Sequence, residues 1–171
     1  MTISEIMKKM ILYSNGNTHD INHFMKVYGY AKMIGECEHL AAKEQKILEI
    51  AAILHDIACP LCREKYGNTD GKRQEEEGIP LVYSFLKGTG EEQEIVERTA
   101  YLVGHHHTLT DIDGMDYQIL VEADYLVNAD ESGYSKENIR NVMEKVFKTD
   151  TGKTLLQGIY LSDFPSAFNR E

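Results

Sequence analysis

The sequence AAILHDIA at positions 51–58 places a histidine and an aspartate inside an otherwise apolar run. His55 follows Ala51 by four residues, so helical periodicity puts both on one face, which should be buried. A buried carboxylate such as that of Asp56 costs several kcal/mol unless it is paired or bound to a metal ion. The run therefore predicts either a salt bridge or a metal ion at this histidine–aspartate pair.

Two further side chains lie on helix faces that should be buried. His23 stands one turn before Val27 on an apolar stripe, and Asp124 shares a face with Leu120. Together with the pair at 55–56 they make two imidazoles and two carboxylates, a ligand set that suits Zn, Fe, Ni, Cu or Co and extends toward Mn and Mg. Such an ion can lower the pKa of a water molecule and polarise a phosphoryl group. The four residues outline a hydrolase site.

The rest of the sequence predicts the helices that must hold these side chains. Apolar residues recur at spacings of three and four, and only three prolines occur in 171 residues, which indicates an all-helical protein. We expect helices at 2–13, 18–37, 43–58, 74–87, 91–104, 116–130, 135–148 and 151–161. Pro80 would disrupt the interior of a helix, so the fourth could instead begin near Ile79 after a separate turn at 74–78.

No repeat, low-complexity tract or linker interrupts the chain. We therefore expect a single compact domain over 1–171, with a metal-site core at about 18–130 and C-terminal helices at 135–161. Domains of about 100–200 residues are common.

Composition narrows the class of protein. The formal net charge of −10 argues against a general nucleic-acid binder, because such a surface repels a phosphate backbone. No stretch reaches the roughly 18 consecutive apolar residues that a membrane span needs. Residues 1–11 are amphipathic and lack the continuous apolar region of a signal peptide, and the odd number of cysteines suggests reduced thiols. These features predict a cytoplasmic protein, and they leave its oligomeric state open.

The order of the motifs resembles the HD-domain superfamily of metal-dependent phosphohydrolases, an all-helical group. His23, within HDINHFMKV, looks like the first metal ligand of that family. His55 and Asp56 match the pair that gives the family its name, and Asp124, within EADYL, matches its last ligand. The resemblance implies an HD-domain-like helical bundle that hydrolyses a small phosphoester, with a nucleotide as the expected substrate.

The run GHHHT at 104–108 is similar to a later histidine element of the family. Alternatively, it is an exposed helix end, where cationic imidazole suits the helix dipole. We expect His105 or His106 to contact the phosphoryl group or to transfer a proton. We expect His107 to be an ordinary surface residue.

The sequence further predicts one tightly bound divalent ion per chain. Two-metal relatives usually carry a histidine on the helix after the pair, and none lies between His55 and His105. Residues 74–77 offer a glutamine and three glutamates instead, of which one could be a ligand. Because this run is more typical of a solvated face, a second ion should bind weakly.

The segment 63–73 could bind the substrate's phosphate. It carries the cations Arg63, Lys72 and Arg73 in an otherwise acidic protein. The alternative is a solvated loop without a function, and the sequence leaves both open.

One position departs from the family. Many members have a lysine or glutamate three residues after the aspartate of the pair, where this chain has Cys59. The alternative function is therefore a non-catalytic regulatory module that binds metal and a phosphorylated ligand. Cys59 and Cys62 also form a C-x-x-C pattern, but no second pair completes a zinc site, and a redox motif expects a preceding strand. Two reduced thiols at a helix end are the favoured interpretation.

Overall fold

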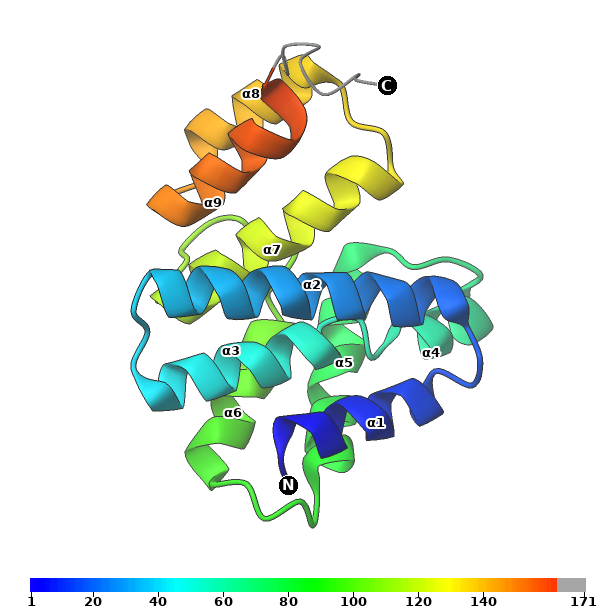
Figure 1. Ribbon diagram of the computed structural model, residues 1–171. Coiled ribbons are helices and arrows are strands. Elements are labelled where there is room, and N and C mark those ends of the chain that lie inside the picture. Colours follow the sequence, from blue (N-terminus) through cyan, green and yellow to red (C-terminus); the bar gives the residue numbers. More distant parts are fainter. Residues whose placement is uncertain (163–171) are drawn as a thin grey trace, which may run out of the picture.

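The computed structural model describes residues 1–162, which form nine α-helices, a short π-helix and no strand (Figure 1). This confirms the predicted all-α fold. The α-helices are α1 (Ile3–Tyr13), α2 (Thr18–Cys37), α3 (Ala42–Leu54), α4 (Cys59–Tyr66), α5 (Gly71–Leu86), α6 (Gln93–Val103), α7 (Met115–Glu131), α8 (Lys136–Lys145) and α9 (Asp150–Leu156), and the π-helix η1 is Gln157–Leu161. None of the described helices is long and apolar enough to cross a membrane.

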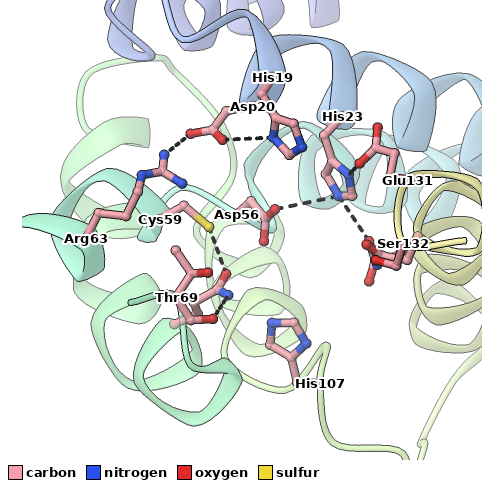
Figure 2. A pocket seen from close by; sticks show the side chains of 13 residues that line it. His19, Asp20, His23, Asp56, Cys59, Arg63, Thr69, His107, Glu131 and Ser132 are labelled. Carbon is pink, nitrogen blue, oxygen red and sulfur yellow. Dashed lines mark hydrogen bonds and ion pairs between the residues drawn. The ribbon is translucent and has the colours of Figure 1, made fainter. Parts of the chain in front are cut away.

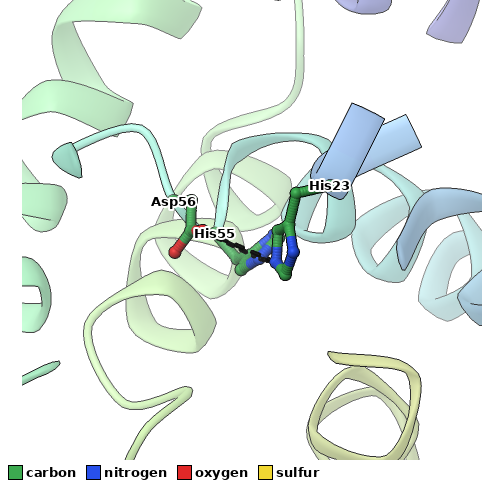
Figure 3. Close-up of side chains that lie close together, drawn as sticks. All are labelled: His23, His55 and Asp56. Carbon is green, nitrogen blue, oxygen red and sulfur yellow. Dashed lines mark hydrogen bonds and ion pairs between the residues drawn. The ribbon is translucent and has the colours of Figure 1, made fainter. Parts of the chain in front are cut away.

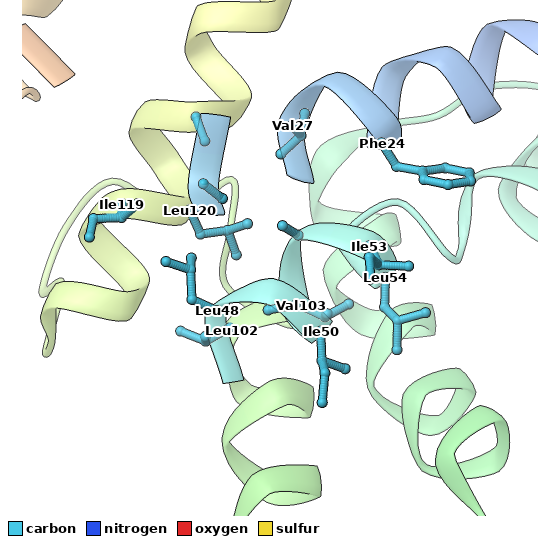
Figure 4. Close-up of a cluster of buried hydrophobic side chains, with 14 of the residues drawn as sticks. Phe24, Val27, Leu48, Ile50, Ile53, Leu54, Leu102, Val103, Ile119 and Leu120 are labelled. Atoms are coloured by element: carbon cyan, nitrogen blue, oxygen red, sulfur yellow. The ribbon is translucent and has the colours of Figure 1, made fainter. Parts of the chain in front are cut away.

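Helix α3 forms the centre of the bundle. It packs against α1, α2, α6 and α7, and every residue from Ile47 to Leu54 is buried. A helix buried on all sides is typical of a core position. Figure 4 shows Leu48 of α3 among apolar side chains that include Leu102 of α6 and Leu120 of α7. At about 1.5–3 kcal/mol for each fully buried aliphatic side chain, this packing holds the C-terminal end of α3 in place.

The helix predicted at 43–58 ends earlier, at Leu54, and a helix that the sequence analysis did not predict begins at Cys59. Pro60 explains the break. A proline has no N–H to donate, and its ring collides with the carbonyl four residues earlier, so α3 cannot continue through it. Pro60 lies instead in the first turn of α4, where proline is well tolerated. The pair His55–Asp56 consequently lies in a turn between two helices.

Helix α5 is one continuous helix with Pro80 in its interior, and it begins at Gly71 rather than at residue 74. The separate turn considered for 74–78 is therefore absent. A glycine at position 78 lets α5 approach α6 closely, since a Cβ atom there would lie 2.8 Å from Val103 Cγ1. This contact fixes the C-terminal end of α6, from which the histidine run at 105–107 continues.

The segment after α8 and helix α9 lie against α7. The fully buried Glu122 of α7 accepts hydrogen bonds from the backbone N–H groups of Lys148 (2.6 Å) and Thr149 (3.0 Å). A buried carboxylate requires such partners. The predicted final helix at 151–161 is present as α9 and η1.

Candidate metal centre

His55 is the C-cap of α3 and is fully buried. Its Nδ1 donates a hydrogen bond to the Ala52 carbonyl oxygen at 2.9 Å. The neutral ring therefore keeps its proton on Nδ1, which leaves the Nε2 lone pair free to bind a cation. This Nε2 atom faces Nε2 of His23 at 3.1 Å.

His23 and Asp124 reach the same point from α2 and α7. His23 Nδ1 donates to Glu131 Oε2 at 2.8 Å, and Lys26 binds the other Glu131 oxygen at 3.1 Å. His23 Nε2 lies 3.1 Å from Asp124 Oδ1, which also accepts a hydrogen bond of 2.9 Å from the Asn128 side chain. Figure 2 shows the His23 ring beside the Glu131 carboxylate at the end of α7. Both candidate ligands are thus oriented by further polar side chains.

We call His23, His55, Asp56 and Asp124 the histidine–aspartate cluster, and Figure 3 shows the first three. Both imidazole Nε2 atoms lie 3.6 Å from Asp56 Oδ2. Asp124 Oδ1 lies 3.6 Å from His55 Nε2. Ligands bound side by side, at about 2.0–2.2 Å from a cation, are separated by about 3 Å. The donor atoms are therefore spaced nearly as they would be around one divalent ion.

The carboxylates of the histidine–aspartate cluster need a positive charge close to them. Burial by itself lowers the pKa of His23, but the carboxylates of Asp124 and Asp56 outweigh that effect and raise the pKa to about 9. Burial raises the pKa of Asp56, yet the imidazoles of His55 and His106 hold the pKa of this carboxyl well below its ordinary value. Without a metal ion, a proton on His23 supplies the positive charge that the carboxylates need.

His106 places a further buried nitrogen beside Asp56. It is only 2% exposed, and its Nδ1 donates to the Val103 carbonyl oxygen at 2.8 Å. Its Nε2 has no hydrogen-bond partner within the described residues and lies 3.6 Å from Asp56 Oδ1. An unpaired buried nitrogen is costly, and a cation or a water molecule beside Asp56 would satisfy it. The residues present therefore fit a metal ion.

A second possible ligand group shares Asp56 with the histidine–aspartate cluster. It comprises Asp56, His106 and His107, whose potential ligand atoms all lie within 4.8 Å of one another. His107 is exposed, as we expected, but it also lines the space next to Asp56. Glu75, one of the glutamates considered as a ligand, instead accepts hydrogen bonds of 3.0 Å from the His107 N–H and the Thr108 hydroxyl. It fixes the turn that carries the histidines.

An open cavity of about 220 Å³ lies over the cluster. We call it the first cavity, and Figure 2 shows the side chains around it. Most of its lining is polar: His19, Asp20, His23, Asp56, Cys59, Arg63, Thr69, Gln74, His107, Asp124, Asn128, Glu131 and Ser132. Arg63 is the one lysine or arginine in this set, and its guanidinium is ion-paired with Asp20. The cavity is large enough for a phosphate group beside the cluster.

Several predicted site residues lie elsewhere. The His105 ring stacks on Tyr101, with 4.2 Å between ring centroids, and its Nδ1 donates to the Tyr101 carbonyl. Lys72 and Arg73 do not line the first cavity, and the Arg73 guanidinium lies over the Tyr66 ring. The structure therefore does not bring these two cations to the cavity, and the His105 ring is turned away from the cluster. Lys72 and Arg73, which the sequence placed in a loop, lie at the start of α5.

Two residues that orient the ligands were not predicted from the sequence. Glu131 and Asn128 both lie in the last turns of α7 and contact cluster residues. Asn128 shares the helix face of Asp124, four residues earlier, and that spacing was the available signal. Glu131 carried no such signal, because an acidic residue at a helix end usually faces solvent.

Comparison with known proteins agrees with the fold and the motifs. The family model of the HD domain matches residues 20–143. The chain therefore belongs to the HD-domain family, whose members bind divalent metal ions. Among solved structures, it is similar to a predicted HD superfamily hydrolase from an uncultured Thermotogales bacterium, with a TM-score of 0.64 and 24% identity over 91% of this chain and 83% of that chain. No curated protein matches the chain.

Proposed function

We propose that this protein is a metal-dependent phosphohydrolase that acts on a small phosphoester, with His23, His55, Asp56 and Asp124 as the ligands of one tightly bound divalent ion. The observation that carries the proposal is the convergence of the two histidines on both aspartates beside an open cavity: the His23 and His55 Nε2 atoms lie 3.1 Å from each other, 3.1 and 3.6 Å from Asp124 Oδ1, and 3.6 Å from Asp56 Oδ2. Membership of the HD-domain family supports it, as does the similar structure described as a predicted hydrolase.

A divalent ion held there would supply Lewis-acid chemistry, since it lowers the pKa of water and polarises a phosphoryl group. The protein's own side chains would position the substrate. Arg63 lines the first cavity and would contact a phosphate oxygen there. To do so, its guanidinium would leave the ion pair with Asp20. Burial lowers the pKa of His106, but Asp56 outweighs this and raises it above the ordinary value. His106, whose Nε2 lies 3.6 Å from Asp56 Oδ1, would be placed to transfer a proton to the departing alkoxide.

The alternative, a non-catalytic module that binds metal and a phosphorylated ligand, is favoured by one observation. The Cys59 thiol lies in the first cavity and donates to Gln74 Oε1 at 3.1 Å. Burial and the nearby Asp56 raise its pKa far above the ordinary value of a thiol. This position therefore offers neither the charge nor the acid–base chemistry of a lysine or glutamate.

A substrate screen separates the two functions. Chelator-stripped protein is incubated separately with Mn²⁺, Fe²⁺, Co²⁺, Ni²⁺, Zn²⁺ and Mg²⁺ and with a panel of phosphomonoesters that includes nucleoside monophosphates. We expect metal-dependent release of phosphate that His55→Ala abolishes. Binding of phosphate or a nucleotide to the metal-loaded protein, without turnover of any panel member, would instead support the regulatory module.

A further inference from the structure

A second cavity, of about 210 Å³, lies directly beside the first. The two share His107, Asp124 and Asn128, so both open onto the histidine–aspartate cluster. Of the two cavities, His106 lines only the second. A substrate whose phosphate contacts the cluster from the first cavity can therefore extend its organic part into the second cavity.

The remaining walls of the second cavity are apolar or aromatic. Helix α7, α8 and the segments that flank them contribute Leu109, Val121, Tyr125, Tyr134, Val142 and Val146. The Tyr125 and Tyr134 rings lie beside each other, with 5.5 Å between centroids and an interplanar angle of 39°. Leu109 is 52% exposed and Tyr134 is 39% exposed. Single exposed apolar residues are ordinary, but two at one cavity beside a candidate active site indicate a ligand contact.

Charge and size restrict what this cavity can bind. It has no lysine or arginine in its lining, and its ionisable groups besides the tyrosines are His106, His107 and Asp124 of the metal centre. A chain of further phosphates would have no cation to neutralise it there. Cavities that bind drug-sized ligands measure about 300–1,000 Å³, so this smaller one suits a group about the size of one ring.

We propose that the second cavity binds the organic part of a phosphomonoester, and that this part carries an uncharged, apolar, ring-sized group. This inference rests on the proposed function, and it places the phosphate in the first cavity and the leaving alcohol in the second. The Tyr125 and Tyr134 rings would form the wall on which the substrate's ring packs, because aromatic groups associate well in tilted or offset arrangements.

A binding experiment tests the proposal without requiring turnover. The probes are 3-phenylpropylphosphonate and propylphosphonate, whose carbon–phosphorus bonds resist hydrolysis and which differ only in the ring. Calorimetry with the Mn²⁺-loaded full chain should show at least tenfold tighter binding of the phenyl compound. The variant Leu109→Ala/Tyr134→Ala changes exposed positions, and we expect it to reduce this preference to about twofold or less. Val142→Phe, which fills the cavity, should have the same effect.

Leu12→Ala is the matched control, because Leu12 is 71% exposed on α1 and lines neither cavity. It should keep the full preference for the phenyl compound. Equal affinities for the two phosphonates in the wild type, no binding of either, or a preference that survives both cavity variants would overturn the inference. If the preference depends on the cavity but no phosphomonoester is hydrolysed, the subsite stands and the proposed function fails. If phosphomonoesters are hydrolysed but no ring preference is seen, the proposed function stands and the subsite fails.

Discussion

Glu131→Gln should weaken metal binding although Glu131 is not among the proposed ligands. Its Oε2 accepts a hydrogen bond from His23 Nδ1 at 2.8 Å, and its side chain is only 16% exposed. The carboxylate holds the ring so that Nε2 faces the cluster, and its charge makes the imidazole a better electron donor. The substitution keeps the size of the side chain and removes the charge.

Loss of such a partner of a metal-binding histidine typically lowers metal affinity by about 10–100-fold, or about 1.4–2.7 kcal/mol. We expect at least tenfold here, because solvent screens this partly buried pair only weakly. Calorimetric titration of chelator-stripped protein with Mn²⁺ measures the change. Glu144→Gln makes the same substitution on the exposed face of α8 and should leave the affinity unchanged. A change of less than twofold in Glu131→Gln would refute the assigned role of this carboxylate.

Three further predictions concern the same site. His55→Ala should abolish tight metal binding, so the variant should lose the stabilisation that a native-state ligand gives, about 2.7 kcal/mol at a hundredfold excess over Kd. Thermal unfolding with and without Mn²⁺ measures this loss, and equal Mn²⁺-induced shifts of Tm in wild type and variant would contradict the assignment of His55 as a ligand. Mn²⁺ affinity should rise as the pH increases from 6 to 9 and then level off, because the metal must displace a proton from His23, whose pKa is raised to about 9. A Mn²⁺ affinity that stays constant between pH 6 and 9 would show that His23 is not a ligand. Arg63→Met should raise KM for a phosphomonoester several-fold at low salt, whereas Lys72→Ala/Arg73→Ala, outside the first cavity, should leave KM unchanged. The reverse pattern in steady-state kinetics would support the phosphate role predicted from the sequence for Lys72 and Arg73.

The sequence predicted the all-helical fold and most helix positions, because apolar spacing determines which helix faces are buried. The same reasoning singled out Asp56 and Asp124, since a carboxylate on a buried face needs a partner. It extended α3 four residues too far, to residue 58, because the effect of Pro60 on the preceding turn was not considered.

The histidines at 105–107 could not be separated by sequence alone. They follow the end of α6 at Val103, where the chain turns and helical periodicity no longer indicates which side chain points inward. His106 is buried beside Asp56, while His105 turns back onto Tyr101. Glu131 was equally inaccessible to sequence reasoning, because its contact with His23 depends on how α2 and α7 pack.

Anomalous diffraction from crystals grown with Mn²⁺ tests the central claim most directly, since it locates the ion without reference to any assumed substrate. One strong peak is expected about 2.0–2.2 Å from the Nε2 atoms of His23 and His55 and from carboxylate oxygens of Asp56 and Asp124. Any second peak should be weaker and lie between Asp56 and the histidines at 106–107, in agreement with one tight ion per chain. A strong peak elsewhere, or none at the histidine–aspartate cluster at saturating Mn²⁺, would contradict the proposed metal centre and the hydrolase chemistry that depends on it.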